Sequence, residues 1–160
     1  FWFLQYWMGQ ALWVSITSCA AVISILQNEN DSLNIYVIIG VLIWIIGFSI
    51  EVISDFQKSK FKKSENTTKT FISKGLWSKS RHPNYFGEIT LWVGIYVISL
   101  SSFSDIEYLT LISPLFVYIL LTRMSGVNML EKIADERYGH LSEYVEYKKN
   151  TPVLFLKIWK

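Results

Sequence analysis

The sequence predicts an all-α membrane protein, a polytopic bundle of about four transmembrane helices followed by a cytoplasmic amphipathic helix near the C-terminus. Half of the chain is hydrophobic, at 51% of 160 residues. Asp, Glu, Lys and Arg are absent from four long runs, at residues 1–28, 33–50, 89–104 and 108–122. All 15 Lys and Arg lie in two blocks, one between the second and third runs and one after the fourth. Long uncharged runs separated by charged segments are typical of membrane-spanning helices.

The predicted spans are residues 3–26, 33–55, 84–102 and 106–124. A helix rises about 1.5 Å per residue, so about 20 apolar residues cross a hydrocarbon layer roughly 30 Å thick. The first two spans reach this length directly. The last two reach it when polar residues at their ends, such as Asn84 and Arg123, lie at the membrane interface. Pro114 is expected to kink the fourth span. A soluble bundle of buried helices is the alternative, and the length of the runs disfavours it.

The basic residues predict a topology. Eight lie between Lys58 and Arg81 and seven between Arg123 and Lys160, whereas residues 28–34 and 101–107 contain none. Loops rich in Lys and Arg stay on the cytoplasmic side. We therefore expect an integral membrane protein in which the 58–81 loop and the C-terminal tail share the cytoplasmic face.

The C-terminal part predicts one further helix, and residues 1–160 are expected to form a single membrane domain. Residues 127–138 place apolar side chains at helical spacing on an otherwise charged helix, and Gly139 is its expected C-cap. Cys19 is the only cysteine, and the two histidines are 58 positions apart without nearby cysteine, so we expect no metal site.

Glu51 and Asp55 form the first candidate site. They are four residues apart, so both carboxylates lie on one helical face at the cytoplasmic end of the second span. An ionisable residue at such a depth indicates function by default. The alternative is an interfacial pair that Lys58 or Arg81 neutralises.

The second candidate site is the segment GLWSKSRHPNYFGE, residues 75–88. Pro83 favours a helix start, and a helix N-terminus binds phosphate or carboxylate. Arg81 adds a forked donor that fits phosphate, and Asn84 offers both a donor and an acceptor. Trp77 and Tyr85 are able to stack on a planar ring. A lipid-headgroup anchor is the alternative, but such an anchor does not require Asn84 and Glu88. His82 by itself is expected to be a structural hydrogen-bonding residue.

The third candidate site is the tail, if it folds back on the cytoplasmic face. Its polar residues are Arg123, Glu131, Asp135, Glu136, Tyr138, Tyr144 and Tyr147. Most of these charges are expected on the solvated side of the helix, and Glu131 and the tyrosines are the stronger candidates for function.

Four motifs in this order resemble the steroid 5-alpha-reductase C-terminal family, and in particular its uncharacterised microbial-type membrane branch. They are E..SD.Q from Glu51, KGLW with SRHPNYFGE from Lys74, LLTR.SGV..LE..AD.RYG from Leu120, and Y..Y...TP from Tyr144. The resemblance covers nearly the whole chain. It extends more distantly to isoprenylcysteine carboxyl methyltransferases, which share the RHP.Y.G element.

The resemblance implies that the cytoplasmic ends of the last helices bind NADPH. The residues that it implies for cofactor binding are Glu51, Asp55, Trp77, Arg81, His82, Asn84, Tyr85, Glu88, Arg123, Glu131 and Tyr147. Asn84 matches a residue that binds the nicotinamide amide, and Lys60, Lys62 and Lys63 are candidates for a 2′-phosphate. No Gly-rich dinucleotide fingerprint of the soluble type is present in the sequence.

The resemblance also implies that the chain begins within a middle helix of a longer protein. The Tyr and the acidic residue that meet the substrate carbonyl would then lie on earlier helices, and no catalytic residue is assigned here.

Three functions follow from the resemblance and the residues. The leading one is an NADPH-dependent reductase of an enone carbon–carbon double bond in a sterol-like or isoprenoid lipid, with a role in lipid metabolism. The second is an S-adenosylmethionine-dependent methyltransferase of a lipid-linked or prenylated substrate, and the third is a non-catalytic membrane protein that keeps the fold. The expected partners are the lipid bilayer and an apolar lipid substrate, without nucleic acid.

Overall fold

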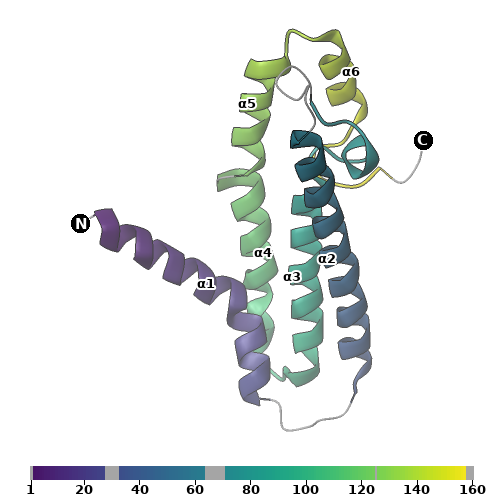
Figure 1. Ribbon diagram of the computed structural model, residues 1–160. Helices are drawn as coiled ribbons and strands as arrows, with labels where there is room; N and C mark the ends of the chain where they lie inside the picture. Colours follow the sequence, from purple (N-terminus) through teal and green to yellow (C-terminus); the bar gives the residue numbers. More distant parts are fainter. Residues whose placement is uncertain (1, 28–32, 64–70, 125, 158–160) are drawn as a thin grey trace. The chain divides into compact units, whose positions relative to one another are not determined.

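A computed structural model describes residues 2–27, 33–63, 71–124 and 126–157. These residues form helices and connecting turns and no β-strand, so the all-α prediction is confirmed (Figure 1). The α-helices are α1 (Trp2–Gln27), α2 (Ile35–Lys62), α3 (Pro83–Ser99), α4 (Ile112–Ile119), α5 (Val127–Tyr138) and α6 (Ser142–Asn150). Short 3-10 helices cover Gly75–Ser78, Leu100–Ser102 and Ile106–Leu111, and a π-helical turn covers Leu120–Met124.

Three helical stretches among the described residues are long and apolar enough to cross a membrane, at Phe3–Gln27, Ile35–Lys62 and Ile106–Tyr138. The third predicted span, 84–102, corresponds to α3, whose 17 residues rise about 26 Å and lie at the short end of the spanning range. Large apolar side chains on α2 are exposed, among them Ile38, Leu42 and Ile46 at 48–56%. A soluble bundle would bury such a surface, so the structure indicates an integral membrane protein.

Two helix boundaries differ from the prediction. α2 continues to Lys62, seven residues beyond the predicted end at residue 55, because Gln and Lys favour helix and the basic Lys60 and Lys62 suit its C-terminal end. The fourth predicted span, 106–124, begins as the 3-10 helix Ile106–Leu111, and α4 begins only at Ile112, so Pro114 lies in the first turn of α4. Proline is tolerated in the first turn of an α-helix.

The chain forms two compact units, residues 1–45 with 89–119, and residues 46–88 with 120–160. In the first unit α1 packs on α4, where the hydroxyl of Ser113 donates to the carbonyl oxygen of Thr17. In the same unit, a Cβ on Gly94 would lie 2.6 Å from the Trp44 backbone nitrogen. The missing side chain therefore allows α3 to approach α2 at backbone distance.

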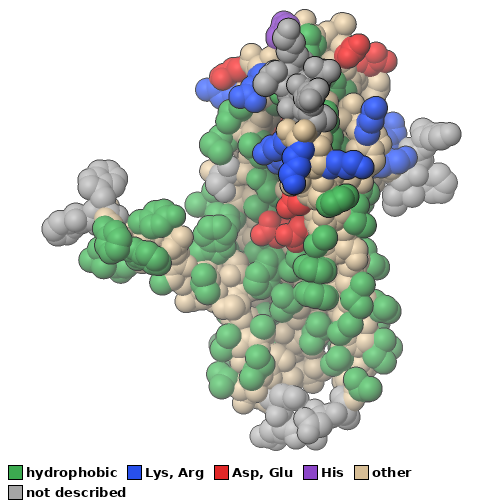
Figure 2. Space-filling view, in the orientation of Figure 1, with side chains coloured by type: hydrophobic (Ala, Val, Ile, Leu, Met, Phe, Trp, Pro, Cys, Tyr) green, Lys and Arg blue, Asp and Glu red, His purple; other side chains and the backbone are tan. Residues whose placement is uncertain are grey.

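The second unit contains all 15 Lys and Arg, together with the three candidate sites. Its elements are the end of α2, the start of α3, α5, α6 and the C-terminal tail. On the face shown in Figure 2, basic and acidic side chains gather over these elements. The chemistry of the chain is therefore found in this unit.

Candidate functional site

Gly87 brings the first two candidate sites together. A Cβ at this position would lie 2.6 Å from the Glu51 backbone nitrogen and 2.7 Å from the Gly47 carbonyl oxygen. Only glycine allows α3 to touch α2 here, and the contact places Glu88 beside Glu51. The carboxylates of Glu51, Glu88 and Asp55 are close enough to repel one another. Together with Tyr85, which is near two of them, they form an acidic cluster.

Glu131 on α5 connects the third candidate site to the second. Its two carboxylate oxygens pair with different residues, Oε2 with the Arg81 guanidinium and Oε1 with His82 Nε2 at 2.8 Å. The three side chains are only 8–18% exposed. A carboxylate that holds two neighbouring cationic or donor groups at this depth fixes the direction of both. His82 is a hydrogen-bonding partner of this carboxylate.

The C-terminal tail holds the backbone of residues 79–82. The N–H of Arg81 donates to the Pro152 carbonyl at 2.9 Å, and the N–H of His82 donates to the Val153 carbonyl at 3.1 Å. The N–H of Lys157 donates to the Lys79 carbonyl at 2.8 Å. Pro83 disfavours helical geometry in the residue before it. The N–H groups of Arg81 and His82 therefore lie outside α3 and need other acceptors. The tail supplies them, and it therefore folds back on the start of α3, which is the condition under which the third candidate site lies beside the second.

Trp77 is fixed rather than free. Its indole N–H donates to the Ser54 carbonyl at 3.0 Å, and its own carbonyl accepts from the Tyr147 hydroxyl at 2.6 Å. The side chain is 5% exposed, and Lys58 Nζ lies 5.3 Å from its ring centroid. Trp77 therefore joins α2 to α6 through Tyr147.

These contacts surround a cavity of about 410 Å³, which we call the aromatic cavity. Among the described residues, its aromatic lining residues are Phe61, Phe71, Trp77, Tyr138, Tyr144 and Tyr147, and its charged ones are Lys58, Lys62, Arg81, Arg137 and Glu131. His82 also lines it. The volume is within the range of about 300–1,000 Å³ that ligand pockets occupy. Four cations against one carboxylate make the cavity suitable for an anion that carries a planar ring.

Burial in the aromatic cavity changes the pKa of two tyrosine hydroxyls and leaves one arginine nitrogen without a hydrogen-bond partner among the described residues. Burial raises the pKa of the Tyr147 hydroxyl well above its ordinary value, and burial with a hydrogen bond to Asp135 does the same for Tyr144. Both phenols therefore stay neutral donors over the physiological range. Among the described residues, the Nε of Arg81 is buried without a hydrogen-bond partner. A donor left in this way costs about 1–3 kcal/mol, and a bound acceptor would remove that cost.

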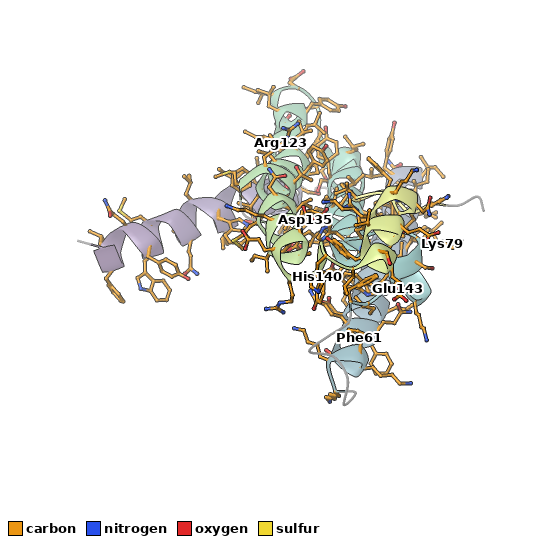
Figure 3. All side chains as sticks on the ribbon, turned by 90° about the horizontal axis from the view of Figure 1, so that it is seen from above. Phe61, Lys79, Arg123, Asp135, His140 and Glu143 are labelled. Atoms are coloured by element: carbon orange, nitrogen blue, oxygen red, sulfur yellow. The ribbon has the colours of Figure 1, made fainter. Side chains whose placement is uncertain are left out.

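The structure brings five of the predicted residues to the aromatic cavity, namely Trp77, Arg81, His82, Glu131 and Tyr147. Three others, Glu51, Asp55 and Glu88, form the acidic cluster and are not part of this lining, and neither is the half-buried Asn84. Tyr85 stacks on His82, with ring centroids 5.7 Å apart. Arg123 is exposed on the π-helical turn, and Figure 3 shows it well separated from Phe61 and Lys79.

Sequence reasoning missed Phe71 and Arg137 as lining residues and gave Lys58 only a neutralising role. Lys58 follows Asp55 by three residues on α2, so the helical spacing contained a signal for it. Phe71 lies in a Lys- and Thr-rich connection, and nothing in the local pattern indicates that its ring contacts Tyr144 and Tyr147.

Comparison with known proteins gives a family and no individual relative. No curated protein and no solved structure matches the chain. Residues 1–151 match the family described as "Protein of unknown function (DUF1295)", a family related to steroid 5-alpha-reductase-like proteins. The match covers every α-helix from α1 to α6 that the described residues form, and the chain belongs to the DUF1295 family.

Proposed function

We propose that the protein is a membrane reductase that uses NADPH to reduce the carbon–carbon double bond of an enone in an apolar, sterol-like or isoprenoid lipid. The observation that carries the proposal is the aromatic cavity, with four cations and one carboxylate among its lining residues. A phosphorylated dinucleotide has several negative charges and two planar rings, so it complements such a lining. The relationship of the family to steroid 5-alpha-reductase-like proteins supports the same reaction class.

The residues present fit this cofactor. The buried Arg81 Nε lacks a partner among the described residues and would gain one from a phosphate oxygen. Lys58 and Lys62 supply further positive charge, and Tyr144 and Tyr147 supply neutral hydroxyls beside it. When bound, NADPH supplies a hydride for the β-carbon of the enone. The part of the protein is to orient the cofactor and to keep Arg81 in place through Glu131.

The apolar helices support a lipid as the substrate. Their exposed side chains face a bilayer rather than water, so an apolar molecule would reach the protein by lateral movement in the membrane. By the placement of Lys and Arg, we expect the aromatic cavity on the cytoplasmic side, where NADPH is available.

One observation favours a second function, an S-adenosylmethionine-dependent methyltransferase of a lipid-linked or prenylated substrate. S-adenosylmethionine carries a sulfonium cation and no phosphate. The acidic cluster of Glu51, Asp55 and Glu88 suits a cation better than it suits a phosphate. This second candidate would use the acidic cluster and leave the cations of the aromatic cavity without a role.

A calorimetric titration of the full chain in neutral detergent discriminates between these functions. We expect tighter binding of NADPH than of S-adenosylmethionine. Arg81→Lys, which keeps the charge opposite Glu131 and removes the guanidinium fork, is expected to weaken NADPH binding by about 1–3 kcal/mol. Arg123→Lys is the matched control and is expected to leave it unchanged. Tighter binding of S-adenosylmethionine would support the methyltransferase, and binding of neither would support a non-catalytic protein.

A further inference from the structure

A groove of about 510 Å³, which we call the outer groove, lies on the first unit of the chain. One wall is α1 and the other is residues 106–112, and α1 packs on the 3-10 helix of this segment and on α4 (Figure 1). The described apolar lining residues are Cys19, Ile23, Leu26, Ile106, Leu109 and Ile112. Three of them, Leu26, Ile106 and Leu109, are 71–80% exposed. No described lining residue is shared with the aromatic cavity, so the outer groove is a separate site.

Hydrogen bonds between helices fix the walls of the outer groove. The hydroxyl of Ser113 on α4 donates to the carbonyl oxygen of Thr17 on α1. Further along α1, Ser24 Oγ lies 3.1 Å from Ser102 Oγ. Thr17 and Ser24 are each within two positions of a lining residue of α1. Because these bonds hold α1 against its neighbours, the groove is a fixed feature of the packing of this unit.

The outer groove has a polar end. Gln27, the last residue of α1, donates from Nε2 to Oε1 of Glu107 at 2.6 Å, and both residues line the groove. The N–H of Asp105 donates to the other carboxylate oxygen, Oε2, at 2.8 Å. Hydrogen bonds to a carboxylate favour its ionised form. Cys19 precedes Gln27 on α1 by about 12 Å of helix rise, so the charge lies at one end and the apolar lining extends away from it.

The carboxylate of Glu107 has no cationic side chain in its own unit. The sequence of residues 1–45 and 89–119 contains no Lys, Arg or His, and its only acidic residues are Glu29, Asp31, Asp105 and Glu107. All four lie in the two connections at residues 28–34 and 101–107. Carboxylates without a neutralising cation attract a positively charged ligand. The ligand that complements the outer groove is therefore an amphiphile with a cationic head and an apolar chain.

A lipid fits this description better than a second copy of the chain. A second copy would bring the same carboxylates to the same depth of the membrane and no cation, so like charges would meet. The placement of Lys and Arg predicts that the Gln27 end of α1 lies at the non-cytoplasmic surface, where a lipid head group is available. A primary ammonium has three N–H donors for the carboxylate of Glu107 and the amide oxygen of Gln27, whereas a trimethylammonium has none.

We propose that the outer groove binds a phospholipid with a primary ammonium head group, of which phosphatidylethanolamine is the probe. The ammonium lies beside Glu107 and Gln27, and one acyl chain lies along α1 toward Cys19. This inference goes beyond the proposed function and does not rest on it, because no described lining residue of the aromatic cavity takes part.

The test measures lipid preference. Native mass spectrometry of the delipidated full chain in neutral detergent gives the affinity for phosphatidylethanolamine, phosphatidylcholine and phosphatidylglycerol with the same acyl chains. We expect phosphatidylethanolamine to bind about fivefold more tightly than the other two, because only its head group donates charge-assisted hydrogen bonds to Glu107. Glu107→Gln keeps an acceptor for the Asp105 N–H and removes the charge, so it should abolish this preference.

Asp105→Asn is the matched control. It removes an exposed carboxylate two residues away that does not belong to the described lining, so the preference should remain. Equal affinities in the wild type, a preference that persists in Glu107→Gln, or its loss in both variants would overturn the proposal.

Cys19 reports the position of the acyl chain without any substitution. It is the only cysteine of the chain, it lines the groove and it is partly exposed. Labelling of the wild-type chain with N-ethylmaleimide should be about threefold slower with phosphatidylethanolamine than with either other lipid, because the rate depends on access to the thiol. Equal rates with all three lipids would mean annular lipid only and would overturn the site. A dimer that protects Cys19 without lipid would assign the groove to a second copy and would overturn it as well.

Discussion

The contacts inside the first unit of the chain differ in kind from the contacts inside the second unit. In residues 1–45 and 89–119 there is no Lys or Arg, and helices meet through small residues and hydroxyls, as where Ser24 Oγ lies 3.1 Å from Ser102 Oγ. In residues 46–88 and 120–160 the contacts instead include ion pairs, a ring cluster around Phe71 and the backbone bonds of the tail. Apolar burial gives little driving force between helices in lipid, so the first unit depends on close approach.

This difference shows where sequence changes should have functional effects. A substitution in the first unit alters helix packing but removes no contact of the aromatic cavity. Every described lining residue of that cavity belongs to the second unit. A change in the second unit alters packing and the cavity together. We therefore compare Glu131 and Gly87 of the second unit each with a matched position, and Tyr147→Phe with the wild type.

The largest effect is expected at Glu131. Glu131→Ala leaves the guanidinium of Arg81 and the ring of His82, which are 11% and 8% exposed, without their carboxylate. Removal of one partner of a buried pair leaves an uncompensated charge, so we expect a loss of about 3 kcal/mol in unfolding free energy. Asp135→Ala, one turn further along α5, removes a 47% exposed carboxylate that pairs with Lys148 and accepts a hydrogen bond from the Tyr144 hydroxyl, and should cost about 1 kcal/mol.

Thermal or denaturant unfolding in detergent micelles measures both variants. The NADPH titration should show weaker binding for Glu131→Ala than for Asp135→Ala, since only Glu131 positions a lining arginine. Equal destabilisation by the two variants would mean that the ion pair at α5 does not organise the second unit.

Sequence patterns predicted the spans well because lipid imposes a length and a composition on each helix separately. The uncharged runs located α1, α3 and the start of α2 to within a few residues, but α2 ends seven residues beyond its predicted end. They did not predict that the last span changes from 3-10 to α to π geometry, because these forms differ in hydrogen-bond register and not in polarity.

The candidate site was predicted only in part, because the sequence identifies residue types but not which helices pack together. The positions of Arg81, His82 and Glu131 were anticipated, whereas their mutual pairing depends on α5 lying beside the start of α3, which no local pattern encodes. The resemblance implied both Arg81 and Arg123 for cofactor binding, yet Arg123 is exposed and outside the lining of the aromatic cavity. Residue type identified the candidates, and only the packing of the helices distinguished them.

A smaller effect is expected at the helix contact of each unit. Gly87→Ala and Gly94→Ala each place a Cβ 2.6 Å from a backbone nitrogen of α2, so the helices must separate. We expect each to lower the unfolding free energy by about 1–3 kcal/mol. Gly9→Ala is the control, because nothing lies within 4 Å of its Cβ, and it should stabilise by up to about 1 kcal/mol.

The glycine variants should differ in ligand binding. Gly87 positions the start of α3 and therefore Arg81 and His82, whereas Gly94 belongs to the first unit. We expect weaker NADPH binding in Gly87→Ala and unchanged binding in Gly94→Ala at temperatures where both are folded. The opposite order would contradict the assignment of binding to the second unit.

The smallest effect at neutral pH is expected for Tyr147→Phe, which removes the hydrogen bond to the Trp77 carbonyl at a cost of about 1 kcal/mol.

This variant should also change how the unfolding free energy depends on pH. Because burial raises the pKa of Tyr147, the unfolded chain loses this proton near its ordinary value of about 10 while the folded chain keeps it. Stability contributed by the neutral phenol is thus present below about pH 10 and falls as the pH rises further. Unfolding measured on both sides of this pH should show a shallower alkaline loss in Tyr147→Phe than in the wild type, and the remaining loss should include Tyr144, whose pKa is raised as well. Parallel profiles for the two chains would mean that Tyr147 is solvated, and that the aromatic cavity is not the dry, ordered site that distinguishes the second unit from the first.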